Sequence, residues 1–212
     1  MLIQPTDHHP AQSSSGWLKR YYFIRFAVSA AWVALAVSVA TKVPALAAVM
    51  LVGYPAWDAL ANFVDAQRNG GLGRNRTQLL NLIASSITAV AVVIALGDSM
   101  NSVLKVFGIW AVLAGLLQLA TAVRRWKASG AQWAMILSGA QSALAGIFFV
   151  KMAGEAASVG IFNVTPYAAF GAFYFLISAI WLTWSDARKN PLRTHTTSCR
   201  EVPCEAGNDR DW

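Results

Sequence analysis

Charged residues are scarce in this sequence, and their scarcity excludes an ordinary water-soluble domain. Asp, Glu, Lys and Arg make up 13% of the 212 residues, and 56% of the residues are hydrophobic. A typical globular domain has about 25% charged residues. The composition therefore indicates a protein solvated mainly by lipid.

Histidine and cysteine are also rare, and they occur only near the two ends of the chain. The three histidines are His8, His9 and His195, and the two cysteines are Cys199 and Cys204. The sequence contains no H-E-x-x-H, no G-x-S-x-G and no phosphate-binding glycine loop before a lysine. The C-x4-C spacing is not a standard zinc pattern, and a fourth ligand is missing. We therefore expect no enzyme, no cofactor and no metal site.

The charged residues that are present are separated by long uncharged runs. Six intervals contain no charged residue: 26–41, 43–57, 77–97, 106–123, 128–150 and 156–185. A helix that crosses the roughly 30 Å hydrocarbon core needs about 20 apolar residues. Four intervals reach about that length unaided. The first borrows residues 21–25, whose Arg25 can extend to the membrane surface, and the second must include Asp58.

These runs predict an all-α, polytopic membrane protein with six transmembrane helices. The membrane domain is expected at residues 21–186, between polar tails at 1–20 and 187–212. The approximate spans are 21–41, 44–64, 77–97, 103–123, 131–150 and 164–185.

The basic residues predict the orientation of the chain. Of its 17 Lys and Arg residues, all but Lys42, Lys105 and Lys151 fall on one side of the predicted spans. The positive-inside rule places that side, with both termini, in the cytoplasm of a bacterial inner membrane. The net charge of +7 then reflects topology and attraction to anionic lipid headgroups. We expect the lipid bilayer as a partner, and no nucleic acid.

The N-terminal region has a second interpretation. Basic residues, an apolar stretch and the sequence Ala45–Ala47 resemble a signal peptide with its cleavage site. Cleavage would keep the sidedness of everything downstream, so the charge pattern does not decide the matter. It would remove part of the repeat described next. N-terminal sequencing of the mature protein distinguishes the two interpretations.

A repeated unit is visible when three glycines are placed in register. Gly53, Gly108 and Gly171 each begin a stretch with an apolar and aromatic body that ends in arginine. The spacing from Gly53 to Gly108 is 55 residues. One helical hairpin cannot bury its own interfaces, whereas repeated hairpins can supply them to each other. We therefore expect the six helices to form three helical hairpins.

The central spans resemble a known family. The stretch Trp110–Phe149 is similar to the short repeat of the HdeD-like acid-resistance membrane proteins. The resemblance lies in Gly115, Gln118, the Arg124–Arg125 turn, Trp133 and the segment LSGAQSALAG. It implies a six-span bacterial inner-membrane protein of largely unknown function, and a role in acid-stress resistance.

A few polar residues lie inside the predicted spans. Asp58 and Asn62 are one helical turn apart on one face of the second helix. Ser85, Gln118 and Gln141 enter the same half of the bilayer from three other helices. Burial of a lone carboxyl favours its neutral form. This candidate cluster is either a hydrogen-bonded clamp between helices or a proton or ligand site.

Small residues form a second pattern. Ser138, Ser142 and Gly146 recur every four residues in the fifth span, with Gly139 beside them. Gly115 on the fourth span offers a facing surface. Because small residues let helix backbones approach closely in lipid, we interpret these residues as helix-packing positions.

Three hypotheses for function follow. The first is an HdeD-like inner-membrane protein that supports acid-stress resistance. The second is a small proton-linked transporter or channel that uses the polar cluster around Asp58. The third is a structural protein that partners another membrane protein or forms a homo-oligomer. Flux in proteoliposomes separates the second from the others, and co-purification of a stable partner supports the third.

Overall fold

The computed structural model describes residues 11–124, 132–155 and 159–189. These residues form six long helices, with a short π-helix at the end of the first, and contain no strand. The elements are α1 (Ala11–Leu35), η1 (Ala36–Ala40), α2 (Pro44–Arg68), α3 (Arg76–Leu96), α4 (Met100–Arg124), α5 (Gln132–Gly154) and α6 (Ile161–Lys189). All six are long and apolar enough to cross a membrane. The predicted all-α, six-span fold is confirmed.

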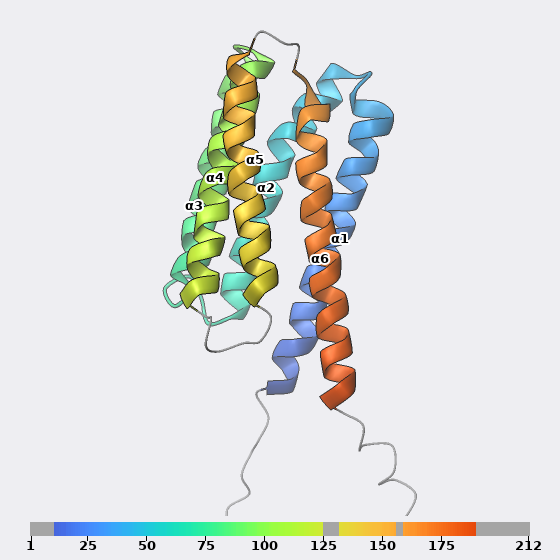
Figure 1. Cartoon of the computed structure of the whole chain (residues 1–212), viewed down its shortest axis with the longest axis vertical. Coiled ribbons are helices and arrows are strands. Elements are labelled where there is room, and N and C mark those ends of the chain that lie inside the picture. The colour runs from blue at the N-terminus through green and yellow to red at the C-terminus, as the bar shows by residue number, and fades with distance from the viewer. Residues whose placement is uncertain (1–10, 125–131, 156–158, 190–212) are drawn as a thin grey trace, which may run out of the picture.

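The helices run up and down, with the tightest packing between particular pairs (Figure 1). The closest pairs are α4 with α5, α2 with α3, and α1 with α6, followed by α3 with α4. Close backbone contact is sparse between α1 and α2 and between α5 and α6. Of the three expected hairpins, α3–α4 is closely packed, whereas α1–α2 and α5–α6 are not; the closest consecutive pairs are α4–α5 and α2–α3.

Two groups of helices result, and we name them here. The body comprises α2, α3, α4 and α5, and the arm comprises α1 with η1 and α6. In Figure 1 the two arm helices lie side by side, with the blue and orange ribbons apart from α3, α4 and α5. We call the end with residues 41–43 and 97–99 the outer end and the opposite end the inner end, after the predicted topology.

The buried apolar core lies toward the outer end. It includes Trp32, Leu51, Leu104, Phe107 and Val164, which come from α1, α2, α4 and α6. Large apolar side chains elsewhere point outward, as in Val49, Ile94 and Leu144, which are 69%, 72% and 67% exposed. Outward apolar side chains suit a lipid surface.

Glycines permit the close contact of α4 and α5. A Cβ atom on Gly108 would lie 2.7 Å from the carbonyl oxygen of Gly146, and one on Gly139 would lie 2.9 Å from that of Gly115. The two pairs are seven residues apart on each helix, so Gly108 faces Gly146 and Gly115 faces Gly139. Because neither helix could carry larger residues at these points, the backbones are in direct van der Waals contact.

The other small residues on α5 differ in their contacts. The Ser142 hydroxyl donates a hydrogen bond of 2.9 Å to the Ala111 carbonyl oxygen of α4. The side chain of Ser138 is half-buried. The structure therefore places Gly115, Gly139, Ser142 and Gly146 of the expected packing set at the α4–α5 interface.

Candidate functional site: an intramembrane ion pair

Asp58 lies within α2, ten residues before its last residue, Arg68. At the helical rise this is about 15 Å from the inner end of the helix. The amide nitrogen of Asn62 donates to the Asp58 carboxylate at 3.0 Å and to the Asp58 carbonyl oxygen at 2.8 Å. The i, i+4 spacing read from the sequence thus brings these two side chains together on one helix face.

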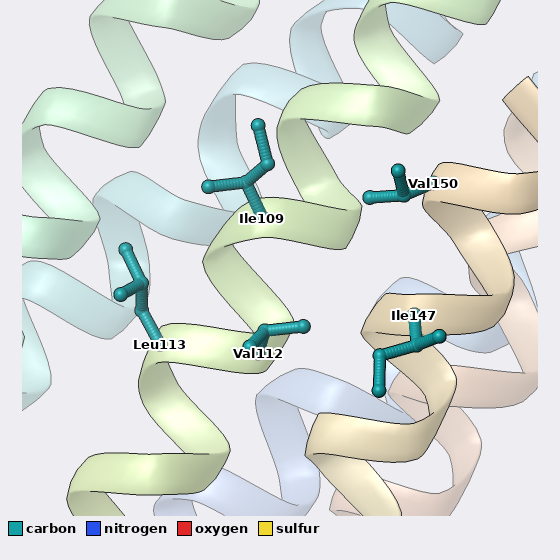
Figure 2. Close-up of a pocket in the computed structure, with 5 residues that line it drawn as sticks. All are labelled: Ile109, Val112, Leu113, Ile147 and Val150. Atoms are coloured by element: carbon teal, nitrogen blue, oxygen red, sulfur yellow. The ribbon is translucent and has the colours of Figure 1, made fainter.

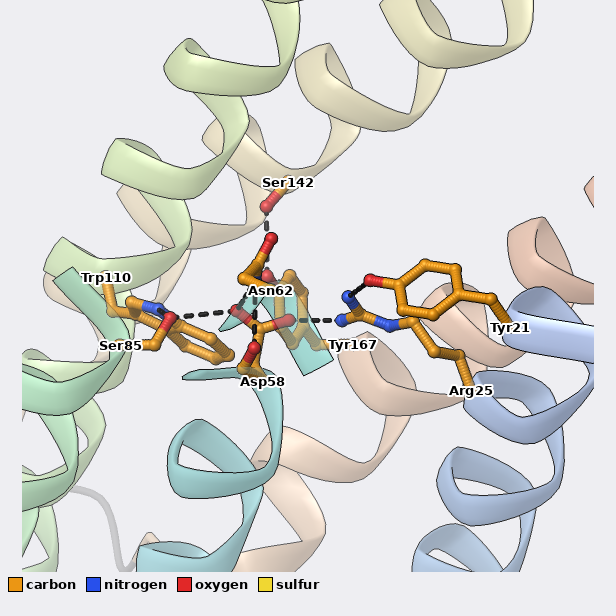
Figure 3. A network of polar contacts seen from close by, with 8 residues as sticks. All are labelled: Tyr21, Arg25, Asp58, Asn62, Ser85, Trp110, Ser142 and Tyr167. Carbon is orange, nitrogen blue, oxygen red and sulfur yellow. Dashed lines mark hydrogen bonds and ion pairs between the residues drawn. The ribbon is translucent and has the colours of Figure 1, made fainter. Parts of the chain in front are cut away.

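Arg25 of α1 forms an ion pair with Asp58 (Figure 3). The two side chains are only 13% and 17% exposed. The expectation that Arg25 extends to the membrane surface is therefore wrong, and so is the premise that Asp58 is a lone acid. The physical reason is mutual compensation: two opposite charges in contact offset much of the cost that each would have alone in the membrane.

The arm holds the guanidinium group of Arg25 in place. Arg25 donates a hydrogen bond of 2.9 Å to the Tyr21 hydroxyl, one turn earlier on α1. Its guanidinium carbon lies 4.4 Å from the ring centroid of Phe175 on α6. A planar guanidinium stacks well on an aromatic face, and its side chain is thereby fixed before it meets the carboxylate.

The body holds the carboxylate of Asp58 in place. The Ser85 hydroxyl of α3 donates to Asp58 Oδ2 at 2.8 Å, and the same hydroxyl accepts a bond of 3.0 Å from Trp110 Nε1 of α4. Arg25 donates to Asp58 Oδ1 and Asn62 donates to Oδ2, so both carboxylate oxygens accept hydrogen bonds. This donor set suits an ionised carboxylate, because that form only accepts hydrogen bonds.

Two expected members of the cluster lie elsewhere. The Gln141 amide oxygen of α5 accepts a bond of 2.8 Å from the Tyr174 hydroxyl of α6, which is a separate contact between body and arm. Gln118 is half-buried on α4 and is not among the described donors to Asp58. Helix α4 reaches the site through Trp110 instead, eight residues or about 12 Å nearer the outer end.

Aromatic rings continue the site toward the outer end. Ring centroids are 5.1 Å apart for Trp32 and Tyr54, 5.8 Å for Tyr54 and Trp110, and 6.2 Å for Trp110 and Tyr167. The Tyr167 hydroxyl shares a hydrogen bond of 3.0 Å with that of Ser142. Side chains therefore fill the seam between arm and body, with polar ends paired and ring edges against ring faces.

Sequence reasoning missed Arg25, Tyr21, Trp110 and Tyr167. For Arg25 a signal was present. The first two uncharged intervals are both short, and the charges that shorten them have opposite signs. Opposite charges inside two consecutive spans predict an intramembrane pair. The other three residues are ordinary membrane aromatics in the sequence, and only the fold shows their partners.

An acid outside the spans, Asp98, has a local role. It precedes α4 and accepts hydrogen bonds from the hydroxyls of Ser102 and Ser99, the second at 3.2 Å. Both hydrogen bonds lower the pKa of Asp98 below its ordinary value, and the bond from Ser102 has the larger effect. The Ser99 hydroxyl accepts the backbone N–H of Ser102 at 3.2 Å. This is the geometry of a helix start.

The described part of the chain has few side chains of the kinds that bind metal ions. It holds no group of three His, Cys, Asp or Glu side chains that could bind a metal ion. His195, Cys199 and Cys204 lie outside the described residues.

A groove of about 260 Å³ lies on the outside of α4 and α5 (Figure 2). It is lined by Ile109, Val112, Leu113, Ile147 and Val150. These side chains offer no polar group to a ligand.

Fold and site together define an integral, multi-pass membrane protein with an ion pair between its helices. Residues 83–151 match the family described as "Short repeat of unknown function (DUF308)", which is the family of the HdeD-like membrane proteins. The match covers most of α3, all of α4 and most of α5, and it includes Ser85 and Trp110 but neither Arg25 nor Asp58. No curated protein and no solved structure matches this chain.

Proposed function

We propose that this chain is a non-enzymatic protein of the bacterial inner membrane that supports resistance to acid stress. In this proposal the Arg25–Asp58 pair is the part of the protein that responds to protons. The observation that carries the proposal is the ion pair itself, since it lies inside the spans and joins helices of the two groups. Charged residues within membrane spans are costly, and they commonly serve a function.

Protons act on this pair through charge. When Asp58 takes up one proton it becomes neutral, and the Arg25 guanidinium loses its counter-ion. An unpaired arginine at this depth is unfavourable by a few kcal/mol, about 2.5–3.5 on insertion scales for the centre of a helix. The protein then has a reason to rearrange that it lacks at neutral pH. The match of residues 83–151 to a short repeat of unknown function, the repeat of the HdeD-like membrane proteins, supports acid stress as the setting.

The test is survival of acid challenge. A deletion strain carries the wild type, Asp58→Asn or Asp65→Asn at matched membrane levels. Asp65 is the control because it lies seven residues further along α2 and bonds to Asn69 and Gln78 rather than to a cation. We expect rescue by wild type and Asp65→Asn, and little or none by Asp58→Asn. Full rescue by Asp58→Asn, or no effect of the deletion, contradicts the proposal.

A second candidate is a small proton-linked transporter. The sparse backbone contact between arm and body favours it, because alternating access often moves one helix group against another. Its test is proton flux in proteoliposomes under an imposed pH gradient. Flux that is present with wild type and lost with Asp58→Asn supports transport. Background flux with wild type contradicts it.

A further inference from the structure

The described ends of both chain connections between arm and body lie at the outer end. Residues 41–43 join η1 to α2, α5 ends at Gly154, and α6 begins at Ile161 (Figure 1). Close backbone contact between arm and α2 is also concentrated there, since the backbone of η1 approaches α2 more closely than that of α1 does. Ala36 and Ala40 of η1 are 0% and 2% exposed. The arm is therefore attached to the body at one end, by its backbone and by small residues.

The attachment includes an irregular helical turn. Residues Ala36–Ala40 form a π-helix at the end of α1. A π-turn is a local departure from α-helical hydrogen bonding, and such turns often occur at functional sites. Because η1 lies between α1 and the short connection to α2, a change in its hydrogen bonding would alter the direction of α1. Its position is that of a hinge.

The arm itself holds together as a unit. Lys19 of α1 forms an ion pair of 3.0 Å with Asp186 of α6. The rings of Tyr22 and Phe175 stack with centroids 6.3 Å apart. Arg25 also stacks on Phe175. These contacts bind α1 to α6 from the inner end to the level of the ion pair.

Toward the inner end, arm and body meet through side chains. Beyond the Arg25–Asp58 pair, the Arg68 guanidinium of α2 lies 4.7 Å from the Trp17 ring centroid of α1. Arg25 is about 11 residues, or some 16 Å, from the start of η1. A small rotation at the hinge therefore produces a larger displacement at the ion pair.

We propose that the arm is a lever that turns about η1, and that the Arg25–Asp58 pair is the latch that holds it against the body. Uptake of one proton by Asp58 from the inner side releases the latch, with no covalent change. Arg25 keeps its charge and turns toward the inner membrane surface. The proton trigger rests on the proposed function, whereas the lever rests on the geometry alone.

The groups that face Asp58 are few. From the arm they are Arg25 and Tyr21 of α1 and Tyr167 of α6, and on α2 itself the group is Tyr54. Helices α3 and α4 contribute the Ser85 hydroxyl and the Trp110 indole, which do not titrate. Arg25 is thus the one cation facing Asp58 in the described residues, and Asp58 is its partner.

Electron–electron distance measurements between spin labels test the lever. The full-length chain, with Cys199→Ser and Cys204→Ser, is labelled in nanodiscs at exposed, lipid-facing positions. Ile83→Cys on α3 with Ile180→Cys on α6 reports the inner end, and Ile94→Cys with Phe162→Cys reports the outer end. Ile24→Cys with Ile180→Cys is the control within the arm.

We expect Asp58→Asn to lengthen or broaden the 83–180 distance by several ångström. The 94–162 and 24–180 distances should change little. In the wild-type background, acidification should produce the same change, and Asp58→Asn should abolish that response. Asp65→Asn should behave as wild type.

Three outcomes overturn the inference. If the 83–180 distance is the same in wild type and Asp58→Asn, the pair is no latch. If the 94–162 distance changes as much, the motion is no rotation about the outer end. If the 24–180 distance changes too, the arm is not a unit. If the distances change as expected but acid survival does not depend on Asp58, the proposed function is wrong and the latch is still supported.

Discussion

At the scale of residues, the main feature is that Arg25 and Asp58, two buried charges on different membrane helices, are partners of each other. Asp58 alone would disfavour insertion of α2, and Arg25 alone would disfavour that of α1. Their contact explains why both are tolerated. It also means that the two residues should depend on each other in stability measurements.

A double-mutant cycle measures that dependence. We expect Asp58→Asn and Arg25→Gln each to lower the free energy of unfolding by about 3 kcal/mol, because each leaves one charge without a partner. The double variant Arg25→Gln, Asp58→Asn should lose less than either single variant, since no charge remains buried. Thermal unfolding in detergent supplies the comparison. Additive losses would show that the pair contributes nothing as a pair.

Ser85 offers a second prediction at this scale. Ser85→Ala removes a donor to Asp58 and leaves Trp110 Nε1 buried without its acceptor. We expect a loss of about 1–3 kcal/mol in the free energy of unfolding. Ser86→Ala, at the exposed neighbouring position, is the control and should have almost no effect. Equal effects of the two variants would contradict the importance of the Ser85 bridge.

At the scale of elements, helix contact is decided by which faces carry small residues. Gly108 and Gly115 on α4 meet Gly146 and Gly139 on α5, and this pair packs most closely of all. Below η1, the arm and body meet instead through large aromatic rings, such as Trp32 on Tyr54 and Tyr167 on Trp110. Small residues thus bring two helix backbones into direct contact. Large aromatic residues instead leave an interface that is made by side chains.

Glycine substitutions test this distinction. In Gly146→Ala the new methyl group would lie 2.6 Å from the Val112 backbone nitrogen, so α4 and α5 must move apart. We expect a loss of about 1–3 kcal/mol, the usual cost of overpacking. Gly53→Ala is the matched control, because no atom lies within 4 Å of its added Cβ. A thermal shift for Gly146→Ala no larger than that for Gly53→Ala would contradict the close contact.

At the scale of the whole molecule, the proposed proton uptake by Asp58 depends on the orientation of the chain in the membrane. The inner end of the molecule carries Lys19, Arg20, Arg68, Arg74 and Arg188, whereas Lys42 and Lys105 are at the outer end. This asymmetry predicts that protons reach the pair from the cytoplasm.

Reporter fusions test the orientation. We expect green fluorescent protein fused at the C-terminus to fluoresce and alkaline phosphatase fused there to be inactive. Phosphatase inserted after Gly97, between α3 and α4, should be active. The opposite pattern would place the inner end outside the cytoplasm and reverse the source of the proton.

The sequence by itself determined the fold class and the number of spans, because hydrophobic length and the cost of charge in lipid act locally along the chain. It also placed Asp58, Asn62 and Ser85 in one half of the membrane, since depth follows from helical rise. The opposite charges in the first two spans allow a pair, but only the tertiary structure decided that Arg25 contacts Asp58, that Trp110 rather than Gln118 reaches the site, and that α1 pairs with α6. Those features depend on the rotation of each helix about its axis and on its choice of neighbour. Residues far apart in the chain set both jointly, through contacts that no local pattern records.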